Sequence, residues 1–340
     1  MKKIITNSYI TNRNKPKNLN PDDEKLFINE FTKKIEDTAL YFYKNISYSN
    51  NILYKYKFFS VDPGIYKMDT ENWNKYKETV KSLITIFKFN QKTKHEKIGK
   101  GAWVIDDKSH NFFHWMTDVM SRVQMINKYK NEYPILIPER YKSYDFIKES
   151  IKLFDLNVLY FDENKRYIIQ DALLTTHAAP AGNYNQKIIN QFIERALKKI
   201  KPYLNKNSPK KICLSRQNQL RRVLNNEEEF NNLITKYDYK IVFPEEMSLK
   251  DQIKMFFQAD SVISLHGAAL TNIMFMKPNS KILEIRIFSD DVRNAFFSLA
   301  SELGIDYFYF LADANSSDLV SDLEIDLKKF EKLINEYEKV

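Results

Sequence analysis

The chain has 340 residues, 43% of them hydrophobic, which is enough to fill two cores and excludes wholesale disorder. With 6 glycines and 10 prolines it is not a low-complexity chain. The net charge of +9 comes from lysines spread along the sequence, which favours a generally basic surface or an anionic substrate over a dedicated nucleic-acid stripe. The single cysteine, Cys213, permits no internal disulfide and suits a reducing compartment.

The first 95 residues carry little chemistry. We expect a polar start, a helix near Pro21 to Lys44 and a strand near Asn51 to Val61, where alternating aromatic residues fit a half-buried strand. The basic N-terminus has no apolar core and is not typical of a signal peptide. No segment approaches the ~18 apolar residues of a membrane span. The sequence therefore predicts a cytoplasmic protein.

From about residue 101 short apolar runs alternate with amphipathic stretches, which predicts β-α-β-α-β and a parallel sheet covered by helices. The expected strands are 102–106, 134–138, 157–161 and 167–176, and the expected helices are 111–129, 141–154 and 185–203.

A polar linker at 205–210 precedes a second alternating series. Its expected strands are 211–214, 239–243, 261–265, 281–288 and 305–310, and its expected helices are 225–237, 248–258, 267–276 and 292–303. We therefore predict an α/β fold of two Rossmann-like domains at 96–204 and 205–325, after an N-terminal extension (1–95) and before a C-terminal helix (326–340). Ligands of such folds bind at the carboxyl ends of the strands.

The sharpest motif is the strand-to-helix junction at residues 265–272 (LHGAALTN). Gly267 and Ala268 let a ligand approach the backbone, and the amides of the helix start favour a phosphate. The further candidates in this motif are His266, Leu270, Thr271 and Asn272. The alternative is a tightly packed turn with a core histidine.

A second motif follows the first strand of this half, at residues 215–222 (SRQNQLRR). Arg216, Arg221 and Arg222 carry guanidinium groups that bind phosphate in a bidentate manner, and Ser215 precedes them. Such groups would stabilise a departing diphosphate. The alternative is a solvated basic loop. Glu245 follows the next strand, and Glu284 lies inside a strand, where it would hold a ribose or pair with a neighbour.

A third motif lies in the first half, at residues 109–118 (SHNFFHWMTD). His114 and Asp118 are four residues apart and share one helix face, so either is a candidate base for an acceptor hydroxyl. Asn111, Trp115 and His177 are candidates for the acceptor side. The alternative is a helix with a polar outer face.

Several signatures are absent from the sequence. It contains no Asp-x-Asp triplet, no P-loop, no G-x-G-x-x-G, no G-x-S-x-G and no Cys/His zinc spacing. We therefore expect neither a metal ion nor a cofactor.

Residues 100–290 resemble glycosyltransferase family 61. The resemblance rests on the His-Gly-Ala-Ala-Leu-Thr-Asn block at 266–272, on Ser215-Arg216 with Arg221-Arg222, on Pro244-Glu245, and on Asn-Phe-Phe-His-Trp at 111–115 with Asp118. It implies a GT-B fold, with the two domains facing each other across a cleft, and an inverting, metal-independent mechanism. It also implies that the matched arginines and the His-Gly-Ala turn hold the donor diphosphate.

The resemblance further implies a nucleotide-sugar donor, foremost a UDP-sugar, and a glycan or lipid-linked saccharide acceptor, as in capsular polysaccharide assembly. The excess of positive charge also allows peripheral contact with an anionic membrane surface, at the inner face of the plasma membrane, and no nucleic-acid partner is expected. Two alternatives stay open: another two-domain transferase, moving a pyruvyl or phospho-sugar group, and a non-catalytic polyanion-binding protein.

Overall fold

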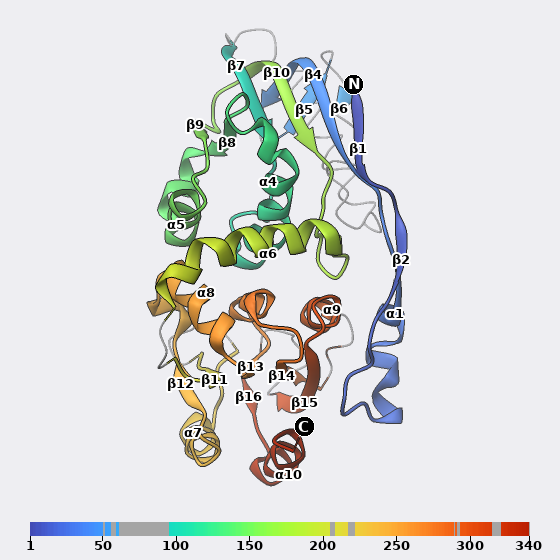
Figure 1. Ribbon diagram of the computed structural model, residues 1–340, viewed down its shortest axis with the longest axis vertical. Helices are drawn as coiled ribbons and strands as arrows, with labels where there is room; N and C mark the ends of the chain where they lie inside the picture. Colours follow the sequence, from blue (N-terminus) through green and yellow to red (C-terminus); the bar gives the residue numbers. More distant parts are fainter. Residues whose placement is uncertain are drawn as a thin grey trace. The chain divides into compact units, whose positions relative to one another are not determined.

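A computed structural model of the chain describes residues 1–49, 52–55, 59–60, 95–204, 208–216, 222–288, 290, 293–314 and 321–339. The chain divides into two compact units, both of them α/β (Figure 1). Unit 1 comprises Met1–Tyr9, Ile35–Ala181 and Lys187–Phe192, and unit 2 comprises Ile10–Lys34, Gly182–Gln186 and Ile193–Val340. The domain bounds expected from the sequence stay predictions.

Unit 1 is built on an eight-stranded sheet in the order β6-β5-β4-β10-β7-β8-β9, with β1 paired to β4. Its strands are β1 (Lys2–Thr6), β4 (Thr38–Ser49), β5 (Ile52–Lys55), β6 (Phe59–Ser60), β7 (Glu96–Trp103), β8 (Ile135–Pro138), β9 (Val158–Phe161) and β10 (Tyr167–Thr175). The four strands β10, β7, β8 and β9 are parallel, as the alternating pattern predicts. The remaining pairings are antiparallel, so the sheet is mixed.

The helix predicted near Pro21 to Lys44 is wrong over most of its length. The chain there forms the 3-10 helix η1 (Pro21–Leu26), one helical turn α1 (Ile28–Phe31), and then the strands β3 (Thr32–Ile35) and β4. Strand β3 pairs with β2 (Tyr9–Asn12). Strand β4 pairs with β10 along eight residues, so long-range pairing overrides local helical preference here. The predicted strand near 51–61 is confirmed at β5 and β6, and its other residues lie outside the described ranges.

The helix predicted at 111–129 is confirmed as one helical segment that contains a π-helical turn. It consists of α3 (Phe112–His114), the π turn η4 (Trp115–Val119), α4 (Met120–Ile126) and the 3-10 turn η5 (Asn127–Tyr129). Asn111 caps its start, because its side-chain oxygen accepts a hydrogen bond from the amide of Phe113 at 2.9 Å. The next helical segment is η6 (Glu139–Ser143) with α5 (Asp145–Leu153), and α6 (Gln186–Ile200) with η7 (Lys201–Tyr203) follows β10.

Unit 2 is built on a six-stranded sheet in the order β12-β11-β13-β14-β15-β16. Its strands are β11 (Lys211–Leu214), β12 (Lys240–Val242), β13 (Ser261–Leu265), β14 (Lys281–Ile287), β15 (Asp306–Ala314) and β16 (Leu323–Glu324). All neighbours are parallel except β15 and β16. The first five strands thus have the doubly wound order 2-1-3-4-5, and the order in which the chain adds strands to the sheet reverses between β11 and β13.

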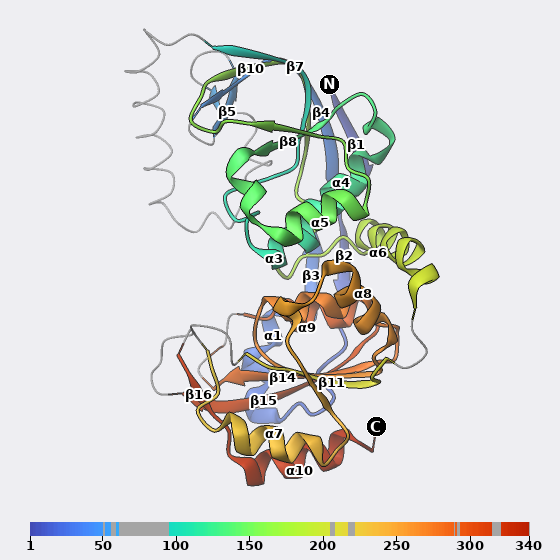
Figure 2. The same cartoon turned by 90° about the vertical axis from the view of Figure 1, so that its left-hand side faces the viewer.

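Helices cover both faces of this sheet. Figure 2 shows α8 (Leu249–Gln258) and α9 (Ala295–Glu302) on one face, and α7 (Glu227–Thr235) and α10 (Leu327–Tyr337) on the other. The helix predicted at 248–258 is confirmed as α8, which Ser248 caps, since its hydroxyl accepts from the amide of Asp251. The N-terminal segment Ile10–Lys34 packs on this unit, where the ring of Phe27 contacts those of Phe297 and Tyr309.

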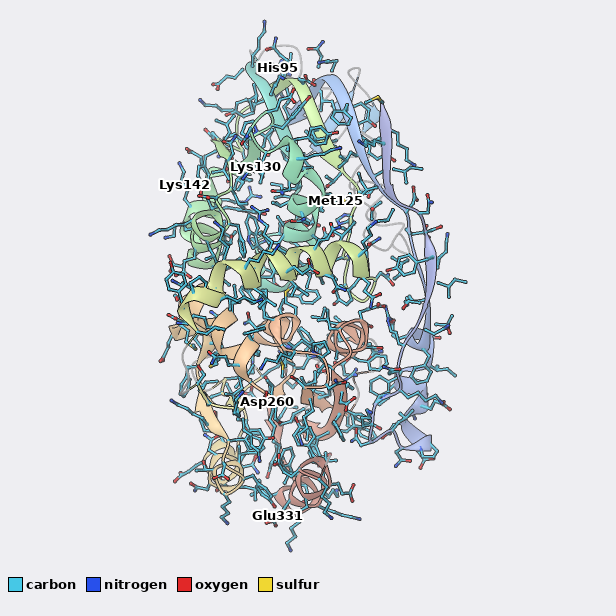
Figure 3. All side chains as sticks on the ribbon, in the orientation of Figure 1. His95, Met125, Lys130, Lys142, Asp260 and Glu331 are labelled. Carbon is cyan, nitrogen blue, oxygen red and sulfur yellow. The ribbon has the colours of Figure 1, made fainter. Side chains whose placement is uncertain are left out.

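Charged side chains project from the surface of both units, as Lys142 and Glu331 show in Figure 3. Of the helices in the described part of the chain, none has the length and apolar content needed to cross a bilayer.

Candidate functional site

The carboxyl ends of three neighbouring strands of unit 2 bring charged residues together. Arg216 follows β11, His266 follows β13, and Asp290 with Arg293 follows β14. Because β11 and β13 flank the point at which the strand order reverses, these residues lie where doubly wound sheets bind their ligands.

Two arginines pack against the His266–Gly267 turn. Arg222 donates from Nη1 to the carbonyl oxygen of His266 at 3.0 Å, and Arg216 donates from Nε to the carbonyl of Arg222 at 3.3 Å. A Cβ added at Gly267 would overlap Nη1 of Arg216, so this glycine makes room for the guanidinium group. The guanidinium group of Arg216 thus lies in the space that the glycine leaves open.

Burial and mutual repulsion act on the arginines of this cluster. Burial, together with the nearby guanidinium groups of Arg216 and Arg293, lowers the pKa of Arg222. Burial likewise lowers the pKa of Arg216, and the Glu245 carboxylate opposes that shift. The Nε of Arg222 is buried without a hydrogen-bond partner among the described residues, and its backbone lies in the left-handed region at φ 54°. A strained residue with an orphaned donor is expected where a ligand binds.

Behind these arginines, three side chains form a buried hydrogen-bonded row. Nδ1 of His266 bonds to Oε1 of Glu284, whose Oε2 accepts from the hydroxyl of Tyr307 at 2.6 Å. Glu284 is fully buried inside β14, and burial together with its charge raises the pKa of Tyr307 well above the ordinary value. Glu284 thus orients the imidazole of His266 and is not itself exposed to a ribose.

The other predicted residues of unit 2 have different surroundings. Ser215 is buried and donates to Glu227 at the start of α7, while Glu245 is exposed in η8 (Pro244–Glu246). The helix predicted after the motif at 265–272 is the 3-10 helix η9 (Ala268–Phe275), and its first residue, Ala268, is half-buried. Three of the residues predicted to bind the donor, Leu270, Thr271 and Asn272, lie in this helix and are fully buried. Asn272 donates to Gln252 of α8, so it holds two helices together. Arg221 lies outside the described residues.

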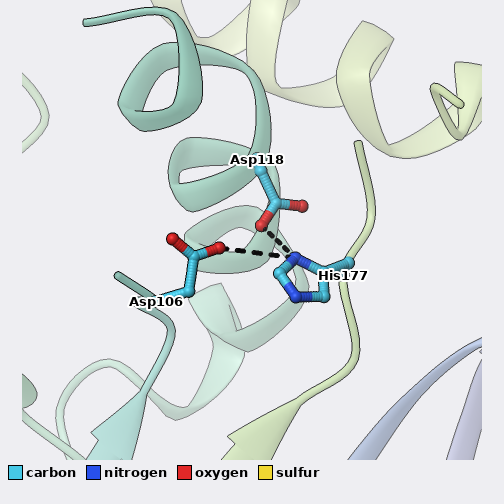
Figure 4. A group of neighbouring side chains, drawn as sticks. All are labelled: Asp106, Asp118 and His177. Carbon is cyan, nitrogen blue, oxygen red and sulfur yellow. Dashed lines mark hydrogen bonds and ion pairs between the residues drawn. The ribbon is translucent and has the colours of Figure 1, made fainter. Parts of the chain in front are cut away.

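A second cluster lies in unit 1, around Asp118 in the π turn η4 (Figure 4). Oδ2 of Asp118 accepts from Nδ1 of His177 at 2.6 Å, and Oδ1 accepts from the amides of Ala178 and Ala179 at 3.0 Å each. Arg122 lies one turn further along, with Nη1 3.5 Å from Oδ2. The π turn therefore aims a carboxylate at the loop that follows β10, and such turns are frequent at functional sites.

The carboxyl group of Asp118 stays ionised despite its burial. Burial alone would raise its pKa, but His177, Arg122 and the amide of Ala179 outweigh it and hold the pKa well below the ordinary value. Arg122 in turn donates to the hydroxyl and the carbonyl of Thr175 at the end of β10. The alternative interpretation of this motif, a helix with a polar outer face, does not hold at Asp118 and Arg122, because both side chains are buried.

The remaining predicted residues of unit 1 differ in exposure. His114 is half-buried, and burial lowers its pKa, while the charges of Asp106 and Asp118 oppose that shift. Trp115 is in the core, where its ring nitrogen donates to Ser150 of α5 at 2.9 Å, and it has no surface for a sugar. Asn111 is an exposed cap.

Sequence reasoning missed Asp106, which follows β7 and whose Oδ2 lies 3.8 Å from Nδ1 of His177. Its position after a strand was the available signal. Among the described residues, Asp106, Asp118 and His177 are the group whose ligand atoms come within 4.8 Å of one another, the spacing that a metal ion requires. However, Nδ1 of His177 is hydrogen-bonded to ionised Asp118, so this nitrogen carries a proton and is not a free ligand.

The low pKa of Asp118 predicts a pH-dependent contribution to stability. A group whose pKa is lower in the folded than in the unfolded chain stabilises above the unfolded value of ~3.9 and loses this contribution as pH falls. Asp118→Asn should therefore lower the free energy of unfolding at pH 7 and flatten its decline below pH ~4. Urea unfolding at several pH values measures both. The exposed neighbour variant Asp107→Asn should keep the wild-type profile, and an unchanged profile in Asp118→Asn would contradict the assignment.

The doubly wound sheet of unit 2, with charged residues at its switch point, defines an α/β protein of the class that binds its ligand at the carboxyl edge of the sheet. Comparison with known families makes this specific: the family model described as Glycosyltransferase 61 matches residues 112–283, just over half of the chain. The chain belongs to glycosyltransferase family 61 and is a glycosyltransferase. A search of curated proteins gives no significant match. The matched range includes Asp118, His177, Arg216 and His266.

Proposed function

We propose that this enzyme is an inverting, metal-independent glycosyltransferase that uses a nucleotide sugar, foremost a UDP-sugar. The donor diphosphate binds to Arg216, Arg222 and the turn at Gly267 in unit 2. The acceptor, a glycan or a lipid-linked saccharide of surface-polysaccharide assembly, binds to unit 1, and the two units act as the two domains of a GT-B enzyme. The basic surface and the single cysteine support a cytoplasmic enzyme that works at an anionic membrane surface.

One observation carries the donor site: the guanidinium groups of Arg216, Arg222 and Arg293 come together at the switch point of unit 2, where burial and the other two groups lower the pKa of Arg222. A diphosphate would neutralise them and supply acceptors for their donors, including the orphaned Nε of Arg222. The same groups would stabilise the diphosphate as it leaves, which is the charge that develops in the transition state. Inversion follows if the acceptor oxygen attacks in line with the departing diphosphate.

A panel of thermal-shift and transfer assays tests this proposal. UDP-, GDP- and CMP-sugars, the free nucleoside diphosphates, phosphoenolpyruvate and a nucleic-acid duplex would each be added to the purified chain. A nucleotide sugar at a hundred times its Kd should stabilise the fold by ~2.7 kcal/mol. Stabilisation by phosphoenolpyruvate alone would indicate a pyruvyl transferase, and binding only to polyanions, with steep salt dependence, would indicate a non-catalytic protein.

Gly267→Ala provides a second test of the donor site. The new Cβ would displace the guanidinium group of Arg216, and one charge-assisted hydrogen bond is worth ~1.5–3 kcal/mol. We therefore expect the Kd of the donor to rise about 10- to 100-fold, as measured by calorimetry. Gly99→Ala in β7 is the matched control, since a Cβ there meets no atom within 4 Å. Wild-type affinity in Gly267→Ala would remove Arg216 from the donor site.

A further inference from the structure

The imidazole ring of His177 has one satisfied nitrogen and one unsatisfied nitrogen. Nδ1 is bonded to Asp118 at 2.6 Å, whereas Nε2 is buried and has no hydrogen-bond partner among the described residues. The side chain is only 9% exposed. A buried polar atom without a partner is destabilising, so such an atom is expected to be retained where a ligand supplies the partner.

The network fixes which nitrogen is free to accept a proton. Since Asp118 is ionised and accepts at Oδ2, the proton of neutral His177 lies on Nδ1 and the lone pair lies on Nε2. The loop is rigidly held, because Asp118 also accepts from the two amides that follow His177 in sequence. The ring therefore presents an oriented acceptor and has a carboxylate behind it to stabilise the imidazolium form.

Both carboxylates near this ring already accept hydrogen bonds. Asp118 is buried, and His177, Ala178, Ala179 and Arg122 already engage its oxygens, which lowers its affinity for a proton. Asp106 accepts from Ser109 and from the amide of Lys108 through Oδ1.

His114 faces the same cluster and is neutral near pH 7, because burial lowers its pKa. The charges of Asp106 and Asp118 favour its charged form, but no described carboxylate hydrogen-bonds to its ring to orient it. His177 is therefore the residue of this cluster that is built to accept a proton.

We propose that His177 is the catalytic base of the transfer and that Asp118 is its positioning residue, an inference that rests on the proposed function. Nε2 takes the proton of the acceptor hydroxyl as its oxygen forms the new bond to the anomeric carbon. The bond from that carbon to the donor diphosphate breaks at the same time, and its electron pair leaves with the diphosphate. The imidazolium then releases its proton to solvent after the product departs. The acceptor class is thus a saccharide whose hydroxyl hydrogen-bonds to Nε2.

Substitution of the base gives the first test. His177→Ala should lower kcat about 100- to 10,000-fold while donor affinity stays at the wild-type value, and added imidazole should restore part of the rate. His177→Gln, whose amide can keep the bond to Asp118, serves if the alanine variant unfolds. His95→Ala, at the opposite end of the parallel strands, is the matched control and should retain full activity. Wild-type transfer by a folded His177 variant would overturn the assignment of the base.

The positioning role of Asp118 can be tested by a measurement that does not depend on activity, namely the protonation of each ring nitrogen of His177. The chain contains only five histidines, so nitrogen-15 labelling of histidine resolves individual rings by NMR. The wild-type His177 signal should show Nδ1 protonated and Nε2 unprotonated. In Asp118→Asn the amide can donate to Nδ1, which moves the ring proton to Nε2 and should lower kcat with little change in KM. An Nε2-protonated ring in the wild type would overturn the proposal.

Two further outcomes are distinguishable. If transfer by the wild type is abolished by a chelator and restored by a divalent cation, Asp106, Asp118 and His177 are metal ligands, and the base assignment fails. If the wild type neither binds nor consumes any nucleotide sugar, the proposed function fails before the role of His177 arises.

Discussion

Replacing Arg216 with alanine should lower kcat/KM for the nucleotide sugar about 100- to 1,000-fold. Loss of one preorganised donor aimed at developing negative charge has effects of this size in other enzymes. Arg216 lies on Gly267 at the switch point of unit 2, where the diphosphate is proposed to leave. Arg216→Lys should recover only part of the rate, because an ammonium group is a point charge and cannot bind two phosphate oxygens in parallel. Steady-state kinetics with the donor found in the panel measures both variants.

Stability separates this effect from misfolding. Arg216 lowers the pKa of Arg222, which means that the two guanidinium groups repel each other in the unliganded protein. The unliganded Arg216→Ala variant should therefore be as stable as the wild type or slightly more stable, while stabilisation by donor is lost. Arg166→Ala, before β10 in unit 1, is the matched control and should behave as the wild type. Undiminished turnover by Arg216→Ala would remove the diphosphate site from this edge of the sheet.

The parallel sheet of unit 2 could be predicted because strands and helices alternate regularly along its sequence. Each of the strands β11, β12, β13 and β14 is a short apolar run that is bounded by turn residues and followed by a helix, and the helices after β11 and β12 are amphipathic. Parallel strands separated by helices share one carboxyl edge, so the placement of Arg216 and His266 at that edge followed from sequence alone. That Arg216 packs directly on Gly267 is a side-chain arrangement which no sequence pattern encodes.

Two features of unit 1 could not be predicted from the local sequence pattern, because both depend on contacts between distant parts of the chain. Strand β4 is a strand because it pairs with β10, more than a hundred residues later, and its own sequence also allows a helix. The partnership of Asp118 with His177 has the same origin, since it requires the helix after β7 to pack beside the end of β10. Sequence reasoning therefore singled out both residues and could not pair them. It also placed Trp115 near a sugar, because helical spacing does not distinguish a core ring from an exposed one.

The same long-range packing makes Arg13 a determinant of the stability of unit 2. Its side chain is completely buried, with Nη1 2.5 Å from Oε2 of Glu30, Nε 3.5 Å from Oε1 of Glu302, and Nη2 donating to the carbonyl of Gly182. Arg13→Met should lower the free energy of unfolding by ~3–5 kcal/mol, because it leaves the buried carboxylate of Glu302 without its counter-charge, whereas Glu30 keeps its ion pair with Lys33. Urea unfolding followed by circular dichroism measures this change. Lys15→Met removes an exposed ion pair with Glu24 and should cost at most ~1 kcal/mol.

The pH dependence of the Arg13→Met variant identifies the carboxylate responsible. Burial raises the pKa of Glu302, and Arg13 opposes that shift, so removing Arg13 should raise the pKa further. A group whose pKa is raised on folding favours the folded state more as pH falls and it binds its proton. The deficit of Arg13→Met relative to the wild type should therefore shrink as pH is lowered from 7 towards 5. Adding Glu302→Gln should recover part of the lost stability at pH 7, whereas additive losses in the double variant would show that the two residues are not coupled.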